Sequence, residues 1–343
     1  MLFRLFLCLL LIISLSTSVL ACWGFRPMGM GGVFVAVADD ANIAYWNRAG
    51  AGQMDNWKDG EKQFIWTSTV LDNVGFFNRK ARVGNTYYDS FNFAQKLNHD
   101  WGWTLAGTWN GGGSFVLSPG FGFRLPGGGV MDQMSLGMGL NFWTLEGYWN
   151  NLKLNQFYTQ MHLDYLYKIT SEFNFGVHIE RFWQISTTQS FPDDNVAGFP
   201  KTFSGQIAES MNFRPAIAWM PQGNLKGLIV NAGIYDLFAQ GGGPHYSFGF
   251  EFTPQAEFKK IVTGKGKDKK VKYVEDDKAW LQNSHFRAGI YNMLGAPGQQ
   301  HSAVMLGYGY DLNKDLEIGG NGYFGFADSS GGWSISGGVA WKN

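Results

Sequence analysis

The sequence predicts an all-β fold: a closed antiparallel transmembrane β-barrel of about 14 strands with an N-terminal hatch inside its lumen. Three observations predict it. From about residue 62 onward, runs of roughly ten residues alternate apolar with small or polar side chains, between Gly, Asn, Asp and Pro turns. After Ala21 no run of about 18 apolar residues remains to form a membrane-spanning helix. Aromatic residues form 17% of the chain, charged residues only 16%, and 47 residues are glycine, whereas soluble domains usually carry about 25% charged residues.

Residues 1–21 have the features of a secretory signal peptide. Arg4 supplies a short positive region, residues 5–15 are almost wholly apolar, and Val19-Leu20-Ala21 forms a small-residue cleavage site. An uncleaved anchor helix is the less favoured alternative, because the apolar run is short for a membrane span. We therefore expect export through this leader, with the bacterial cell outer membrane as the destination of the barrel.

Cys22 would be the first residue after that cleavage site. The other cysteine, Cys8, lies in the leader, so no internal disulfide is expected in the mature chain. Residues 19–22 resemble a lipoprotein box, in which the cysteine is acylated at the new N-terminus. Two outcomes stay open: lipidation of Cys22, or ordinary cleavage before an incidental cysteine.

Residues 24–50 do not alternate like the rest, and residues 22–60 are predicted to form a hatch. Glycines at 29, 31 and 32 let the backbone pass close to a wall and adopt positive φ. Residues 33–38 are apolar and small enough for a confined lumen, and Asp39 and Asp40 can cap a helical turn that runs through Tyr45. The alternative is a plain amphipathic strand or helix in a soluble core.

Residues 61–343 are predicted to form the barrel, and residues 135–142 show its pattern most clearly. Leu136, Met138, Leu140 and Phe142 share one face, while the other face carries Ser, Gly and Asn. A soluble sandwich would present long charged side chains on its second face, whereas a small face fits a crowded lumen.

Fifteen candidate runs occur, and the preference of bacterial barrels for even numbers favours 14 strands. The run at 114–124 is the weakest because Pro119 interrupts it. The runs begin near Phe64, Val74, Thr86, Trp101, Ser114, Ser135, Asn155, Glu172, Met211, Leu225, His245, Asn283, Ser302, Asp315 and Trp333.

Two long connections, 186–210 and 259–277, are predicted to be loops outside the bilayer. The second holds seven lysines followed by three acidic residues. Its charge indicates a patch for lipid headgroups or a partner, or, as the simpler alternative, a solvated loop tip.

Part of the N-terminal segment resembles the signature of the FadL/OmpP1 superfamily of outer-membrane barrels, nearest to its PorV/PorQ-like branch. The resemblance rests on Met28-Gly29-Met30-Gly31-Gly32, on Phe34-Val35-Ala36-Val37-Ala38-Asp39-Asp40 and on Tyr45-Trp46-Asn47. It implies a hatch that precedes the first strand and packs inside the barrel. Two departures stand out. Arg48 occupies the position where the family usually has proline, and Trp341 is followed by two more residues rather than ending the chain.

The resemblance implies uptake or binding of hydrophobic small molecules, which enter a pocket near the hatch and leave sideways through a strand kink. Met28, Met30, Phe34 and Trp46 are the expected pocket residues. The full predicted set of hatch and ligand-binding residues is Met28, Gly29, Met30, Gly31, Gly32, Phe34, Asp39, Asp40, Trp46 and Asn47.

Two rival roles remain open. PorV-like barrels are components of protein secretion that bind partner proteins, and a purely structural barrel is the third alternative. The expected partners are therefore outer-membrane lipid, hydrophobic small molecules and secretion-system proteins. Because the formal net charge is zero, nothing indicates nucleic acid.

Four polar residues on two neighbouring predicted strands should face the lumen: His162, Asp164, His178 and Glu180. The favoured interpretation is a salt-bridge network, with Arg214, Glu251 or Arg287 as further members. A metal site and a proton-sensitive gate are the alternatives. The sequence holds no nucleophile elbow, phosphate loop or zinc-type cysteine pair, so neither an enzyme nor a cofactor is expected.

Overall fold

The computed structural model describes residues 24–71, 86–110, 115–149, 152–190, 202–204, 211–235, 237, 244–255, 258–263, 270–275, 279–291, 302–325 and 333–343. The predicted leader, Cys22 and the predicted run near Val74 lie outside these residues.

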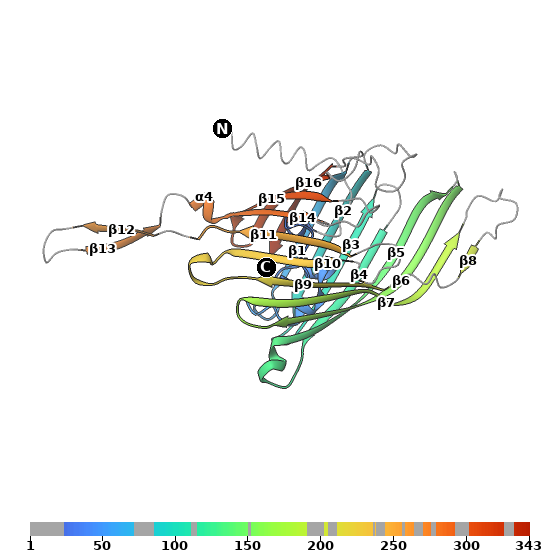
Figure 1. The fold of residues 1–343 in the computed structure, drawn as a ribbon, viewed down its shortest axis with the longest axis horizontal. Helices are drawn as coiled ribbons and strands as arrows, with labels where there is room; N and C mark the ends of the chain where they lie inside the picture. Colours follow the sequence, from blue (N-terminus) through green and yellow to red (C-terminus); the bar gives the residue numbers. More distant parts are fainter. Residues whose placement is uncertain are drawn as a thin grey trace.

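Fourteen antiparallel strands form a closed ring, which confirms the predicted barrel (Figure 1). Each strand pairs with its neighbour along the chain, and β1 pairs with β17 to close the ring. The ring strands are β1 (Lys62–Leu71), β2 (Thr86–Lys96), β3 (Trp101–Asn110), β4 (Phe115–Arg124), β5 (Met134–Trp149), β6 (Leu152–Lys168), β7 (Phe173–Ser190), β9 (Asn212–Trp219), β10 (Leu228–Tyr235), β11 (His245–Phe252), β14 (Ser284–Tyr291), β15 (Ala303–Asn313), β16 (Leu316–Gly325) and β17 (Trp333–Lys342). A short strand, β8 (Thr202–Ser204), pairs with the end of β7.

Every predicted run within the described residues corresponds to a ring strand. The weakest of them is β4, which pairs continuously with β3. Its ladder to β5 is interrupted between Leu117 and Gly120. Pro119 lies in that gap and has no N–H to donate, which explains the interruption.

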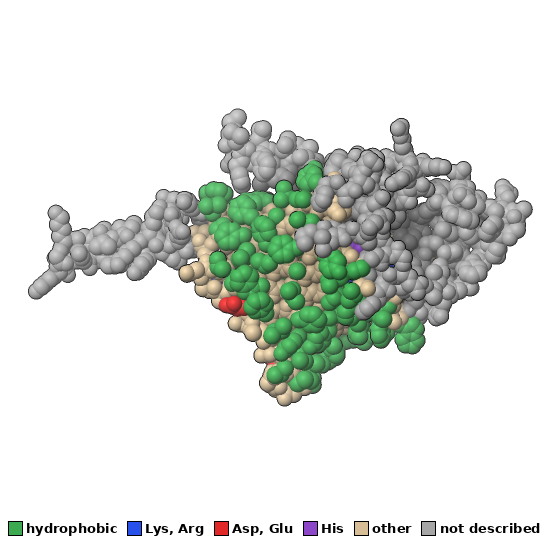
Figure 2. Space-filling model, in the orientation of Figure 1, with side chains coloured by type: hydrophobic (Ala, Val, Ile, Leu, Met, Phe, Trp, Pro, Cys, Tyr) green, Lys and Arg blue, Asp and Glu red, His purple; other side chains and the backbone are tan. Residues whose placement is uncertain are grey.

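The two faces of the wall differ as the alternation predicts. In β5, Ser135, Gly137, Gly139 and Asn141 are buried, while the apolar residues between them are partly exposed. Figure 2 shows hydrophobic side chains over much of the outer surface in that view. Strongly exposed apolar side chains of the outer face include Trp66, Trp101, Trp103, Phe248, Phe250, Phe252, Phe286, Leu306, Phe324 and Trp341. An apolar outer face is what a wall in contact with lipid requires.

The two ends of the barrel are unlike each other. At one end, here named the turn end, β1 begins, β17 ends and several connections are short, such as residues 97–100, 169–172 and 314–315. At the opposite end, named the loop end, lie the connections that follow β1, β7 and β14.

The lysine-rich connection differs from its prediction as a loop. β12 (Phe258–Thr263) and β13 (Lys270–Glu275) form a two-stranded antiparallel sheet of their own. This hairpin follows β11 at the turn end and extends away from the ring in Figure 1. These strands are hidden in the sequence because lysines interrupt the run of apolar residues. The first long connection also begins later than predicted, since β7 continues to Ser190.

Within the described residues, helical structure is limited to short pieces. They are α2 (Phe25–Gly29), α3 (Ile43–Trp46), α4 (Ala279–Gln282) and the 3-10 helices η2 (Arg48–Gly52), η3 (Gly129–Gln133) and η4 (Gly223–Leu225). None of the helices in the described ranges is long and apolar enough to cross a membrane.

Candidate functional site

The N-terminal segment, defined here as residues 24–54, is buried along nearly its whole length. Within it, only Asp39 is exposed. α2 contacts β14 to β17, α3 contacts β2 to β4, and η2 contacts β2 to β6. Because these contacts reach strands on opposite sides of the ring, the segment lies inside the barrel and crosses its lumen.

The wall carries glycines where the backbone of the segment passes. A side chain added at Gly249 would collide with the Met30 carbonyl, and one at Gly122 would collide with the Arg48 carbonyl. Gly289 lies in the same way against Gly31. The small inner face seen in the sequence is therefore the surface against which this segment packs.

Amide and hydroxyl side chains of the wall satisfy the irregular backbone of the segment. Asn321 donates to the Phe25 carbonyl at 2.9 Å, Asn231 to Val33 at 2.7 Å, Asn174 to Ala36 at 3.0 Å and Ser135 to Ala49 at 2.8 Å. From within the segment, Asn47 donates to the Val35 carbonyl at 2.6 Å and to the Tyr165 carbonyl of β6 at 3.0 Å. Backbone buried outside regular structure needs such partners, so these side chains keep the segment in one path.

Arg48 ties one side of the segment to the wall. The Arg48 network, defined as Arg48, Ser118, Asn141, Asp164 and His178, is sealed from solvent: the side chains of Arg48 and Asp164 are 1% and 0% exposed. The Arg48 guanidinium donates to Asp164 at 3.3 Å, to Asn141 at 3.4 Å and to the Ser118 hydroxyl. His178 Nδ1 lies 2.5 Å from the other Asp164 oxygen.

Arg26 ties the other side, near the turn end. The Arg26 network, defined as Arg26, Asp39, Asp40, Glu251, Arg287 and Glu317, joins the segment to β11, β14 and β16. The Arg26 guanidinium donates to Glu251 and Asp40 at 2.8 Å and to Asp39 at 2.6 Å. Arg287 donates to Glu251 at 2.6 Å and to Glu317 at 2.7 Å.

Burial raises the pKa of Asp40 from 3.8 to about 6, against the opposing effect of Arg26 and with a further contribution from the Asp39 charge. Asp40 also accepts a hydrogen bond from the Asn42 amide at 2.7 Å. It therefore supports the turn before α3, but Asn42 precedes α3 as its N-cap, so neither aspartate caps this helix as predicted, and Asp39 is engaged by Arg26.

A third tie lies just after the segment. Asp55 accepts from Lys168 at 2.6 Å and from Arg124, which lie at the turn ends of β6 and β4. Burial alone would raise the pKa of Asp55, but the hydrogen bonds and charges of Lys168 and Arg124 lower it below its ordinary value.

Aromatic side chains gather where the segment faces the loop end. The aromatic floor is defined as Trp46, Tyr235, Tyr291 and His245. Ring centroids are 6.3 Å apart for Trp46 and Tyr235, 6.1 Å for Tyr235 and Tyr291, and 6.4 Å for Tyr291 and His245. Tyr235 and Tyr291 are the last residues of β10 and β14, and the Tyr235 hydroxyl donates to the Gly32 carbonyl.

The four predicted pocket residues are divided between different surroundings. Met30 and Trp46 belong to one apolar cluster with Tyr235, while Met28 packs with Ala303, Met305 and Tyr323. Tyr291 packs against both clusters. Phe34 also belongs to the first cluster, but the Arg26 guanidinium lies 5.3 Å from its ring centroid.

The four predicted lumenal polar residues lie together on β6 and β7. The rings of His162 and His178 stack 5.4 Å apart. Glu180 accepts from Arg214 at 2.5 Å and from Asn212 at 3.1 Å. Glu251 accepts from both Arg26 and Arg287 instead, so the charged residues of the lumen form separate networks.

The ladder between β6 and β7 is broken at this place. Met161 pairs with Trp183 and Leu163 with Ile179, so three β7 residues oppose His162 alone. Arg181, in the middle of the bulge, has a φ of 59°. Phe182 and Trp183 are both exposed, 48% and 61%, although they are consecutive. The wall is therefore locally irregular where its outer face is apolar.

Sequence reasoning missed Arg26 and Arg48 as structural anchors. Arg48 was visible only as a departure from a family proline. A buried arginine in an otherwise apolar or small segment is a signal that a carboxylate must lie nearby in the fold.

Solved structures with a similar architecture include bacterial hydrocarbon transporters and channels. The Ralstonia pickettii toluene transporter TbuX matches with a TM-score of 0.56 at 11% identity, covering 95% of this chain and 99% of that chain. The CymD monoaromatic hydrocarbon channel matches with a TM-score of 0.57 at 11% identity, covering 96% and 98%. The P. putida toluene transporter TodX matches with a TM-score of 0.54 at 12% identity, covering 94% and 98%.

This chain has the fold of those channels. Identities this low establish the architecture and no more. The three matched proteins are described as transporters or channels. No protein-family model and no curated protein matches the sequence.

Proposed function

We propose that this chain is an outer-membrane channel of the FadL-like superfamily that takes up small hydrophobic molecules, with residues 22–60 as its hatch. The nearer resemblance to the PorV/PorQ-like branch stays a prediction from the N-terminal motif. Export through the leader at 1–21 would place the turn end in the periplasm, because short turns lie on that side of such barrels.

The observation that carries the proposal is the combination of a crossed lumen and an irregular wall. A solute arriving from the loop end meets the aromatic floor, and the N-terminal segment lies across the way to the turn end. Aromatic and apolar side chains make favourable contacts with a hydrocarbon. They offer few charges or hydrogen bonds to an ion or a sugar. The break between β6 and β7 then offers an exit toward lipid past Phe182 and Trp183, beside the polar side chains of His162 and Glu180.

The similar channels are named for toluene and monoaromatic hydrocarbons, so toluene is the first solute to test. They also favour transport over the secretion role. Toluene uptake should be measured in cells with a lipopolysaccharide outer membrane, with and without this protein. Equal uptake by the two kinds of cell would contradict the proposal.

Two tryptophan substitutions test the aromatic floor, one within it and one as a control outside it. Trp46→Ala should reduce uptake several-fold because Trp46 contacts the Tyr235 ring. Trp101→Ala should leave uptake unchanged, since Trp101 lies on the outer face, 45% exposed. Both variants must first show the heat-modifiable migration of a folded barrel.

The exit can be tested by removing the bulge opposite His162, one of two irregularities in this ladder. Deleting Arg181 and Phe182 leaves one β7 residue opposite His162 and preserves the alternation of the strand. A folded deletion variant should still bind toluene at the floor, seen as a change in tryptophan fluorescence, but uptake should fall to the background. Uptake at the wild-type rate would show that the solute leaves elsewhere.

A further inference from the structure

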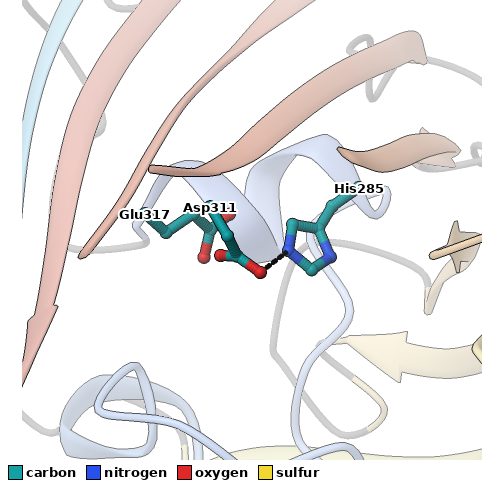
Figure 3. A group of neighbouring side chains, drawn as sticks. All are labelled: His285, Asp311 and Glu317. Atoms are coloured by element: carbon teal, nitrogen blue, oxygen red, sulfur yellow. Dashed lines mark hydrogen bonds and ion pairs between the residues drawn. The ribbon is translucent and has the colours of Figure 1, made fainter. Parts of the chain in front are cut away.

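A group of potential metal ligands lies at the turn end of the barrel, outside the aromatic floor. His285 of β14, Asp311 of β15 and Glu317 of β16 each offer one ligand atom, and these atoms all lie within 4.8 Å of one another (Figure 3). Asp311 and Glu317 are direct cross-strand partners, and His285 lies on the next strand. The geometry points to a site for a divalent transition-metal ion of the zinc class.

The imidazole is already held in the orientation that a metal ligand needs. His285 Nδ1 lies 2.7 Å from the Thr253 hydroxyl, and Nε2 faces an Asp311 oxygen at 3.1 Å. When Nδ1 donates to Thr253, Nε2 carries a lone pair directed at a carboxylate. A cation between these two acceptors removes their repulsion, and a second partner on the far ring nitrogen is typical of metal-binding histidines.

The third ligand is held toward the same place. Arg287 binds one oxygen of Glu317 at 2.7 Å, which leaves the other oxygen for a metal. Gly309, the cross-strand partner of His285, makes room for this carboxylate, since a side chain there would collide with Glu317.

The local charge also favours a cation. Asp311 and the Arg26 network together hold five carboxylates and two guanidinium groups. Two adjacent inward carboxylates, Asp311 and Glu317, repel each other across the ladder. A divalent ion offsets most of the excess negative charge.

Zinc suits the donor set better than calcium, because imidazole is a ligand for transition metals whereas calcium takes oxygen ligands. Bonds of about 2.0–2.2 Å place tetrahedral ligand atoms roughly 3.3–3.6 Å apart. The side chains must therefore close in slightly. Asp311 is 40% exposed and at a strand end, so it can move, and water completes the coordination.

The test is isothermal titration of the folded, tag-free barrel in detergent with zinc chloride, and separately with calcium chloride. One zinc ion should bind per chain, with calcium binding much more weakly. His285→Gln and Asp311→Asn should each weaken zinc binding by at least about tenfold, a loss that even outer-shell substitutions can cause.

His99→Gln is the matched control. His99 also pairs with a neighbouring aspartate, at 2.7 Å, but is strongly exposed and lies apart from the proposed ligands. It should bind zinc like the wild type. If His285→Gln does not migrate as a folded barrel, Asp311→Asn decides. No zinc binding by the wild type, or unchanged binding in the folded ligand variants, overturns the proposal, as does calcium binding of equal strength.

Discussion

The Arg48 and Arg26 networks tie the same segment to the same wall in different ways. The Arg48 guanidinium faces one carboxylate, Asp164, and both are shut off from solvent. The Arg26 guanidinium faces three carboxylates, and one of them, Asp39, is 40% exposed. When an ion pair shielded from solvent loses one partner, the charge of the other partner stays buried. A cluster with several carboxylates that is open to solvent can instead rearrange its contacts. We infer that the Arg48 side is the fixed end of the proposed hatch and the Arg26 side is the end that can open.

The largest effect is expected at the fixed end. Arg48→Met should lower the free energy of unfolding by about 3–5 kcal/mol, because it leaves Asp164 buried without its guanidinium partner. The measurement is reversible urea unfolding of the barrel in lipid or detergent. Adding Asp164→Asn should recover part of the loss, since it removes a buried charge that then faces only His178.

Arg124→Met is the control for that substitution. Arg124 pairs with Asp55, which is 47% exposed, so the loss should be about 0–1 kcal/mol. If Arg48→Met lowered the free energy of unfolding as little as Arg124→Met, the distinction between buried and exposed ion pairs would be contradicted.

A smaller loss of stability is expected at the other anchor. Arg26→Met should cost only about 1–2 kcal/mol, because Glu251 keeps its bond to Arg287 and Asp39 reaches water. It should, however, raise the leak of small hydrophilic solutes through proteoliposomes more than Arg48→Met does. The opposite ranking of leak would mean that the hatch opens from the Arg48 side.

Asp40 should make the Arg26 side sensitive to pH. Because the folded protein raises the pKa of Asp40 from 3.8 to about 6, the fold favours the protonated carboxyl. The stability contributed by Asp40 is therefore fully present below about pH 4 and is lost as the pH rises through about 6. Solute leak should be several-fold greater at about pH 7 than at about pH 5. Asp40→Asn should show the low leak at both values, and a persisting pH difference in that variant would assign it to another group.

The smallest effect is expected at Asp55. Asp55→Asn removes the charge that binds Lys168 and Arg124, but about half of this side chain is exposed. The cost should be below about 1 kcal/mol at neutral pH, measured by the same urea unfolding. A cost as large as that of Arg48→Met would make this rim tie, rather than the sealed one, the main anchor.

The barrel could be predicted because a strand pattern is local. Each ring strand repeats one period over eight or more residues, so even β4, with Pro119, was found. β12 and β13 escaped prediction because their lysines interrupt the run of apolar residues. The anchors Arg26 and Arg48 could not be predicted for a different reason. Arg48 and Asp164 are 116 residues apart, and Arg26 and Glu251 are 225 apart. No periodicity links such pairs, and only ring closure brings them together.

Hydrogen exchange followed by mass spectrometry tests the unequal anchoring most directly. In the folded wild-type barrel at neutral pH, peptides covering residues 24–34 should exchange faster than peptides covering residues 47–54, which should be protected almost as well as the ring strands. Equal protection of the two ends, or faster exchange around Arg48, would contradict a hatch that is fixed at Arg48 and opens at Arg26.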